Sequence, residues 1–164
     1  RDVLYLNGST SGIGGAALVG GRLMTGTSGY GGEFGHMVVR GGASACYCGR
    51  IGCLETEVNV QRLAGLDTAA RAAEVERQAR VLASAAANLV SAFNPELVVF
   101  GGFLAELFGS HSEAVREIVG AETLSPLAHG VRIVRAGLGY AILPLGAAEL
   151  AFAPLLADPV PTRA

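Results

Sequence analysis

The three cysteines of the chain and one of its histidines form a pattern that is typical of a metal site. Residues 33–36 read E-x-G-H, and residues 46–55 read C-x-C-G-x-x-G-C-x-E. One imidazole and three thiolates complete the tetrahedral set that zinc prefers, so no position stays open for a catalytic water. We therefore predict a structural zinc in a loop over residues 36–55. Its predicted ligands are His36, Cys46, Cys48 and Cys53.

The competing interpretation is that the three cysteines are buried thiols without a chemical role. Their clustering inside a short glycine-rich run favours metal binding, since two cysteines separated by one residue do not readily form a disulfide with each other. The odd number of cysteines also prevents a closed set of disulfides. A chain of this kind is typical of a reducing compartment, and we expect a cytoplasmic protein.

Two carboxylates, Glu33 and Glu55, bracket the metal pattern. An ionised carboxylate accepts several hydrogen bonds, which suits the neighbouring hydroxyls of a sugar. His36 has two ring nitrogens, so it can bind zinc through one and contact the same sugar through the other. The alternative is that both acids are solvated surface residues, as most glutamates are. The spacing alone leaves these two interpretations open.

The composition describes one domain with a substantial core. The chain has 164 residues, of which 51% are hydrophobic, and its formal net charge is −2. Because lysines and arginines are not clustered, we do not expect this segment to bind nucleic acid. No apolar run reaches the roughly 20 residues of a membrane span, and we expect neither a signal peptide nor a membrane partner.

Hydrophobic patterning predicts a mixed α/β sheet with strand hairpins first and at least one βαβ unit after them. A glycine-rich connection over residues 8–15 separates the first two strands. The long helix ends at Asn94-Pro95, because proline disfavours a helical residue before it. The predicted strands are residues 3–6, 16–19, 37–39, 97–100 and 131–134. The predicted helices are residues 56–64, 69–93, a helix from 104, 112–124 and 144–156, and residues 158–164 form a tail.

These residues resemble the ROK family, which groups sugar-responsive bacterial repressors with sugar kinases. The resemblance rests on the metal pattern and on three further segments: Gly26-x-x-Gly29-x-x-Gly32 before Glu33, Val98-Val99-Phe100-Gly101-Gly102, and Leu145-Gly146-Ala147-Ala148. It implies an actin-like ATPase fold of the ribonuclease-H type, with residues 1–157 as the C-terminal lobe. It also implies zinc at the four predicted ligands and sugar contacts by Glu33, His36 and Glu55.

The resemblance implies a first lobe that these residues do not contain. That lobe holds a D-x-G-G-T phosphate loop and, in the kinases, an Asn-Asp pair whose Asp is the catalytic base. The stretch between Glu55 and Gln78 is also shorter than is usual in the family. We therefore assign no catalytic residue within this chain.

A glycine-rich loop separates the two branches of the family. Kinases read G-T-G-I-G where this chain reads Thr10-Ser11-Gly12-Ile13-Gly14. A β-branched residue thus replaces a glycine where the backbone approaches phosphate. A glycine loop alone is weak evidence of nucleotide binding, and a plain hairpin is the alternative. The vestigial nucleotide-binding residues, or the active ones if the chain is a kinase, are Ser11, Gly12, Gly14, Gly101 and Gly102.

The run Cys53-Leu54-Glu55-Thr56-Glu57 resembles the repressor branch, since the kinases more often continue to Ser-Gly. We therefore favour the sugar-sensing effector domain of a transcriptional repressor, not an enzyme. Such a protein is a homodimer that binds DNA through a winged helix-turn-helix domain outside this chain. One alternative is the C-terminal lobe of a hexose kinase of the glucokinase or N-acetylhexosamine kinase type, with ATP and magnesium. A zinc-stabilised interaction module is the third. Because the resemblance implies a sheet that packs on a partner lobe, we expect this lobe to expose an apolar face.

Overall fold

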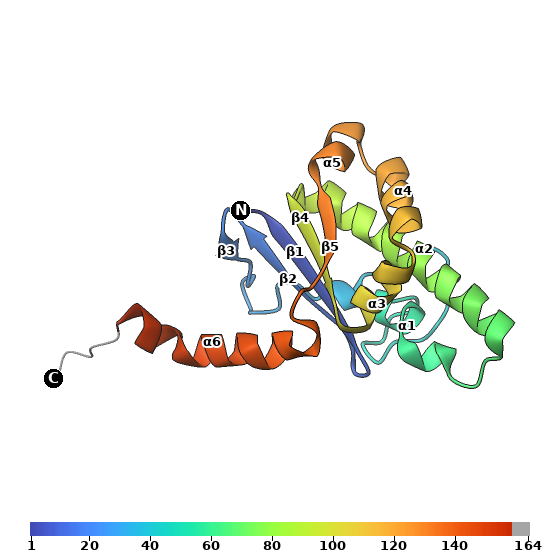
Figure 1. Cartoon of the computed structure of the whole chain (residues 1–164), viewed down its shortest axis with the longest axis horizontal. Coiled ribbons are helices and arrows are strands. Elements are labelled where there is room, and N and C mark those ends of the chain that lie inside the picture. The colour runs from blue at the N-terminus through green and yellow to red at the C-terminus, as the bar shows by residue number, and fades with distance from the viewer. Residues whose placement is uncertain (159–164) are drawn as a thin grey trace.

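The computed structural model describes residues 1–158 and contains one five-stranded sheet (Figure 1). The first two strands form an antiparallel hairpin, and the fourth strand runs parallel to the first and to the fifth. The strand order is β3-β2-β1-β4-β5. The strands are β1 (Val3–Ser9), β2 (Gly12–Val19), β3 (Arg22–Leu23), β4 (Leu97–Gly101) and β5 (Arg132–Arg135).

The helices follow the order of the chain around this sheet. The α-helices are α1 (Leu54–Glu57), α2 (Thr68–Phe93), α3 (Gly102–Ser110), α4 (Ser112–Glu122), α5 (Ser125–Gly130) and α6 (Ile142–Ala157). Three short 3₁₀ turns are η1 (Phe34–His36), η2 (Val60–Leu63) and η3 (Gly139–Ala141). The parallel connections between β1, β4 and β5 confirm the mixed α/β class and the βαβ prediction.

The core lies between one face of the sheet and helices α2, α3 and α4. Alternate residues of β1 are buried, among them Leu4 and Leu6, and they pack with Val98 and Phe100 of β4. Alanines on the buried side of α2 let its backbone approach the core closely. The helix ends at Asn94, whose left-handed φ of 46° caps it before Pro95, as predicted.

Several predicted boundaries were wrong. The strands continue through most of the glycine-rich connection 8–15, because Ser9 pairs with Gly12 and only Thr10 and Ser11 form the turn. Residues 37–39 make no strand and contribute a single bridge, Val38 to Cys53, because the loop they pair with turns sharply.

The helical predictions differ in two places. The predicted helix 56–64 is split into α1 and η2, since Val58 is extended. The predicted helix 112–124 ends at Glu122 because Thr123 is extended, and α5 follows it unpredicted.

Helix α6 extends away from the rest of the chain (Figure 1). None of its residues is buried. An exposed apolar face agrees with the expectation that this lobe presents one. The large apolar side chains that α6 exposes are Leu143, Leu145, Leu150, Phe152, Leu155 and Leu156. Of the predicted tail 158–164, residues 159–164 lie outside the described residues.

Candidate functional site

A tight turn brings the predicted metal ligands together. The backbone N–H of Cys46 donates to the carbonyl of Arg50 at 2.8 Å, and the N–H of Gly49 donates back to the carbonyl of Cys46 at 3.0 Å. Gly49 has a φ of +87° and Gly52 one of +78°, a region that side chains rarely adopt. The N–H of Leu54 then donates to the carbonyl of Met37 at 2.8 Å. The turn is thereby held against the segment that follows His36.

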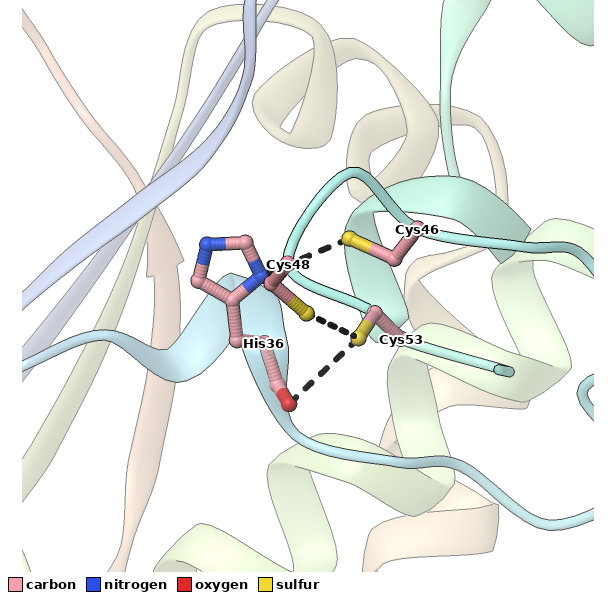
Figure 2. Close-up of side chains that lie close together, drawn as sticks. All are labelled: His36, Cys46, Cys48 and Cys53. Atoms are coloured by element: carbon pink, nitrogen blue, oxygen red, sulfur yellow. Dashed lines mark hydrogen bonds between the residues drawn. The ribbon is translucent and has the colours of Figure 1, made fainter. Parts of the chain in front are cut away.

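The four predicted ligand atoms lie within 4.8 Å of one another (Figure 2). The Sγ atoms of Cys48 and Cys53 are 3.6 Å apart, and Cys46 Sγ is 3.6 Å from His36 Nδ1. A tetrahedral zinc separates two sulfurs by about 3.8 Å, and a sulfur from a nitrogen by about 3.6 Å. The cluster is therefore compatible with a zinc site, and these residues fit the metal in type, number and spacing.

The thiols of the cluster are not equivalent. Burial, assisted by the hydrogen bond to Glu55, raises the pKa of the Cys46 thiol to about 12. The backbone N–H of Arg50 lowers the pKa of the exposed Cys48 thiol to about 6. Because a metal binds thiolates, binding would displace protons chiefly from the buried members of the cluster.

Glu55 lies directly against the cluster of predicted metal ligands. It is the second residue of α1, and its side chain is 8% exposed. One carboxylate oxygen, Oε1, accepts a hydrogen bond from the Cys46 thiol at 3.2 Å and lies 3.4 Å from His36 Nδ1. Glu55 therefore links the predicted metal ligands to any small molecule that binds on its other side.

Tyr47 is a neighbour of this cluster that the sequence analysis did not single out. Its hydroxyl is 3.0 Å from His36 Nε2, the ring nitrogen that faces away from the cysteines, and the two rings meet edge to face. The side chain is nevertheless 83% exposed. The sequence position of Tyr47 between Cys46 and Cys48 could have indicated this contact, because two neighbouring metal ligands hold the residue between them close to the site.

Glu33 is exposed and stands at the start of η1, the turn that ends at His36. The negative charge of Glu55 is the largest of the effects that raise the pKa of the Tyr47 hydroxyl. The charges of Cys46 and Glu33 raise it further. The backbone N–H of His36 donates to the carbonyl of Glu33 at 3.1 Å, which ties Glu33 to the turn that carries His36.

The β1–β2 turn lies between two cavities. One, of about 370 Å³, is called the Glu55 cavity; its lining includes Ser11, Gly12, Ala45, Tyr47, Glu55 and Gln61. The other, of about 240 Å³, is called the Gly102 cavity; its lining includes Asn7, Gly8, Ser9, Thr10, Gly102 and Leu143. Of the predicted nucleotide residues, Ser11 and Gly12 therefore line the first cavity and Gly102 the second.

The ends of β1 and β4 approach each other closely at the Gly102 cavity. A Cβ atom on Gly102, whose φ is +55°, would lie 2.1 Å from the carbonyl oxygen of Gly8. One on Gly101 would meet the hydroxyl of Tyr5 at 2.5 Å. Close packing alone therefore explains why glycine is needed at positions 101 and 102, whether or not a nucleotide binds there.

Gly12→Ala should damage the site, whereas Gly14→Ala should not. Gly12 has a φ of +136°, and a Cβ there would lie 2.4 Å from Glu55 Oε2. We expect a loss of about 1–3 kcal/mol in the free energy of unfolding, with displacement of Glu55. A Cβ on Gly14 meets nothing within 4 Å. Urea unfolding of both variants tests this, and equal stabilities would contradict it.

Comparison with known proteins identifies the chain's relatives. The sequence profile described as the ROK family matches residues 1–64 and 57–153. The chain belongs to the ROK family. The two matched segments overlap at residues 57–64, between Glu55 and Gln78.

ROK relatives include both kinases and a regulator. Glucokinase from Thermotoga maritima is 31% identical over 66% of this chain and 46% of its own length. The structure of ROK hexokinase from Thermus thermophilus has a TM-score of 0.72 and 33% identity, covering 90% of this chain and 57% of the hexokinase. A ROK family transcriptional regulator, a homologue of the E. coli MLC protein, has a TM-score of 0.69 and 21% identity, covering 82% of this chain and 41% of the regulator.

These matches confirm the predicted actin-like ATPase fold of the ROK family. The chain spans about half the length of the curated relatives it matches. No helix within residues 1–158 is long and apolar enough to cross a membrane.

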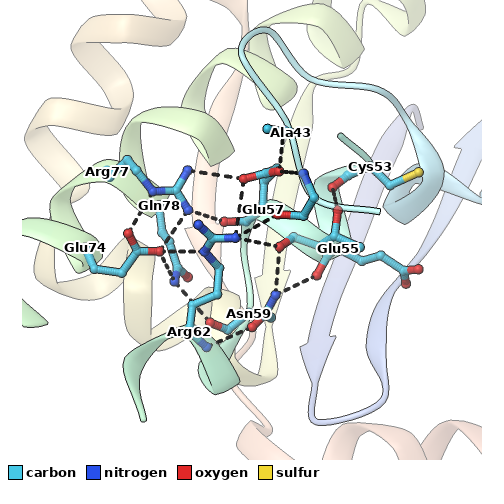
Figure 3. A network of polar contacts seen from close by, with 11 residues as sticks. Ala43, Cys53, Glu55, Glu57, Asn59, Arg62, Glu74, Arg77 and Gln78 are labelled. Carbon is cyan, nitrogen blue, oxygen red and sulfur yellow. Dashed lines mark hydrogen bonds and ion pairs between the residues drawn. The ribbon is translucent and has the colours of Figure 1, made fainter. Parts of the chain in front are cut away.

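A partly buried polar network holds the segment before Cys46 to α2 (Figure 3). The Glu57 carboxylate accepts hydrogen bonds from the backbone N–H groups of Ala43 and Ser44, each at 2.9 Å. These backbone bonds lower its pKa, although burial opposes them. Arg62 and Arg77 each lie 3.6 Å from Glu57, and Glu74 of α2 pairs with both arginines. The segment before Cys46 is thus anchored through Glu57 to the long helix.

Glu74→Gln should destabilise the chain most clearly above pH 4.5. The Arg77 guanidinium, 2.8 Å away, lowers the pKa of Glu74 from 4.5 to about 2. A lowered folded-state pKa adds stability above pH 4.5, and that stability is lost as pH falls toward 2. The shift corresponds to about 3 kcal/mol, so we expect a loss of about 2–3 kcal/mol in urea unfolding at pH 6.

The same variant should flatten the pH dependence of stability between pH 4.5 and 2. Glu76→Gln is the matched control, because Glu76 pairs with Arg80 on the exposed side of the same helix and side-chain exposures there exceed half. It should change the free energy of unfolding by less than about 0.5 kcal/mol. Equal effects of the two substitutions would contradict this account of the network.

Proposed function

We propose that this chain is the sugar-binding effector lobe of a ROK transcriptional repressor, with a structural zinc beside the sugar. The observation that carries the proposal is the position of Glu55. Its Oε1 contacts two metal ligands, and its Oε2 lies near Gly12 at the Glu55 cavity. A carboxylate held in this way can accept hydrogen bonds from sugar hydroxyls without losing side-chain entropy on binding. Glu33 and His36 are the other proposed sugar contacts.

The proposed zinc would be held by His36, Cys46, Cys48 and Cys53. With all four positions filled by protein, the ion would supply rigidity and no reactive water. It would fix the loop that carries Tyr47 and the start of α1 that carries Glu55. The sugar site therefore depends on the metal for its shape.

The repressor assignment rests on the β1–β2 turn and on the run after Cys53. The turn holds Thr10 and Ser11, and the Ser9 hydroxyl accepts a hydrogen bond from the Ser11 N–H at 3.1 Å. Thr10 stands where the family's kinases have the first glycine of G-T-G-I-G. Glu57, in the run that resembles the repressor branch, anchors the metal loop. Sugar binding would then shift the population of lobe arrangements and with it the spacing of two DNA-binding domains in a dimer.

One observation favours a second function, ATP-dependent phosphorylation of a hexose. The Gly102 cavity lies at the carboxyl ends of parallel strands β1 and β4, where ligands bind in many α/β folds. Relatives at about 30% identity are named glucokinase and N-acetylmannosamine kinase. In this case Ser11, Gly12, Gly14, Gly101 and Gly102 would border ATP and magnesium, and a base would have to come from a first lobe.

The two functions are separated by the gene upstream of Arg1 and by a binding experiment. A winged helix-turn-helix followed by a first lobe without the catalytic Asp supports the repressor. An intact D-x-G-G-T loop with an Asn-Asp pair supports the kinase. In the repressor, operator affinity should change when glucose, xylose or an N-acetylated hexosamine saturates the full-length protein. Equal affinity with every sugar would overturn the proposal.

A further inference from the structure

The Glu55 cavity extends past the proposed sugar contacts. Its volume of about 370 Å³ lies in the range of about 300–1,000 Å³ that is typical of small-molecule sites. Glu33 and His36 do not line it, whereas Glu55 does. A sugar ring held by Glu33, His36 and Glu55 would therefore enter the cavity only near Glu55. Most of the cavity would stay open to a second part of the same ligand.

The walls of this cavity combine apolar surface with groups that can hydrogen-bond to hydroxyls. Ser11, Ser44, Asn59 and Gln61 contribute amides and hydroxyls, drawn from the β1–β2 turn, the metal loop and the segment that contains η2. The Gln61 amide donates to the Thr10 carbonyl at 2.6 Å and joins two of these walls. A sugar ring carries both hydroxyls and patches of C–H groups, so it matches such a mixed lining.

The charges around the cavity favour a neutral ligand. Arg62 is the cation in its lining, and its guanidinium lies 2.9 Å from Glu74 and 3.6 Å from Glu57. Glu55 adds a further negative charge to the lining. Because the arginine is already paired with carboxylates, a phosphorylated sugar would gain little attraction here and would meet repulsion from Glu55.

An exposed aromatic ring completes the site. The Tyr47 hydroxyl contacts His36, which orients the ring, while the side chain stays 83% exposed at the edge of the cavity. Sugars present patches of C–H groups that pack on aromatic rings. Tyr47 therefore offers a packing surface between the first ring and the cavity.

We infer that the Glu55 cavity is a second sugar subsite, so that the ligand of this lobe is a neutral disaccharide or glycoside whose second ring lies among Tyr47, Ala45 and Gln61. This inference rests on the proposed sugar function and names its ligand class. The first ring would contact Glu33, His36 and Glu55, and the second ring would make the added hydrogen bonds in the cavity.

Calorimetric titration of the full-length protein tests the inference with matched pairs of sugars. The pairs are glucose with maltose and cellobiose, xylose with xylobiose, and N-acetylglucosamine with diacetylchitobiose; glucose 6-phosphate tests the charge argument. One or two added hydrogen bonds correspond to a gain of about tenfold in affinity. We expect one disaccharide to bind about tenfold more tightly than its monosaccharide, and glucose 6-phosphate to bind no more tightly than glucose.

Two exposed alanines of the metal loop give a matched pair of variants. Ala45 lines the cavity and Ala43 does not, and both side chains are exposed. Ala45→Phe should fill the subsite and abolish the gain from the second ring. Ala43→Phe should leave the gain intact.

The outcomes separate this inference from the proposed function. Monosaccharide binding with no gain from any second ring, an equal gain in Ala45→Phe, or preferential binding of glucose 6-phosphate would overturn the subsite and leave the sugar function standing. Binding of no sugar at all would overturn both.

Discussion

Cys48→Ser should remove the proposed zinc and disorder much of the proposed sugar site. The substitution replaces a thiolate ligand by a hydroxyl that binds zinc poorly, at a position where the side chain is exposed and the fold needs no thiol. Structural zinc contributes about 10 kcal/mol or more of binding free energy in small domains. We expect a loss of more than about 4 kcal/mol in the free energy of unfolding, in the range that loss of a metal produces.

Metal content by mass spectrometry, thermal unfolding and sugar titration measure this effect together. Tyr47→Phe is the control, because it changes the adjacent residue and removes a contact to His36 while all four ligands remain. It should retain the metal. Treatment of the unsubstituted protein with a strong chelator should reproduce the Cys48→Ser result. Unchanged metal content, melting and sugar binding in Cys48→Ser would count against the zinc site.

Much of this site was predictable because its ligands are close in sequence. A histidine and three cysteines within one loop can converge without knowledge of the rest of the fold, and their ligand atoms do lie within 4.8 Å of one another. Helix α2 was predictable for a similar reason, since its apolar period and the Asn94-Pro95 stop are local signals.

The other features of the site could not be predicted, because they depend on contacts between segments that are distant in sequence. Glu57, Arg62 and Glu74 come from α1, η2 and α2, and nothing in the local sequence indicates that the three elements dock together. The apolar run 37–39 resembles a strand, but it pairs only with a sharply turned loop and makes one bridge. Cavities beside the β1–β2 turn are likewise a product of packing, which is why a second subsite could not be anticipated.

Glu55→Gln should strongly weaken sugar binding while the proposed zinc stays in place. The substitution keeps the size of the side chain but replaces two acceptor oxygens with one oxygen and an NH₂ group, so hydroxyl donors on the sugar lose a charged partner. Hydrogen bonds to charged groups contribute about 1.5–3 kcal/mol each, so the loss of one or two predicts about a 100-fold drop in affinity. The metal ligands themselves are untouched, although Glu55 Oε1 lies 3.2 Å from Cys46 Sγ.

Titration of the sugar and measurement of bound zinc decide this prediction together. Glu96→Gln, an exposed acid at the far side of the sheet before β4, is the matched control and should bind sugar normally. Affinity lost with full zinc occupancy would assign Glu55 to the sugar directly. Affinity lost together with zinc would mean that Glu55 acts through the metal cluster instead, and unchanged affinity would remove Glu55 from the site. Because one carboxylate oxygen faces the ligand cluster and the other faces Gly12, this residue is where metal binding and sugar binding can influence each other.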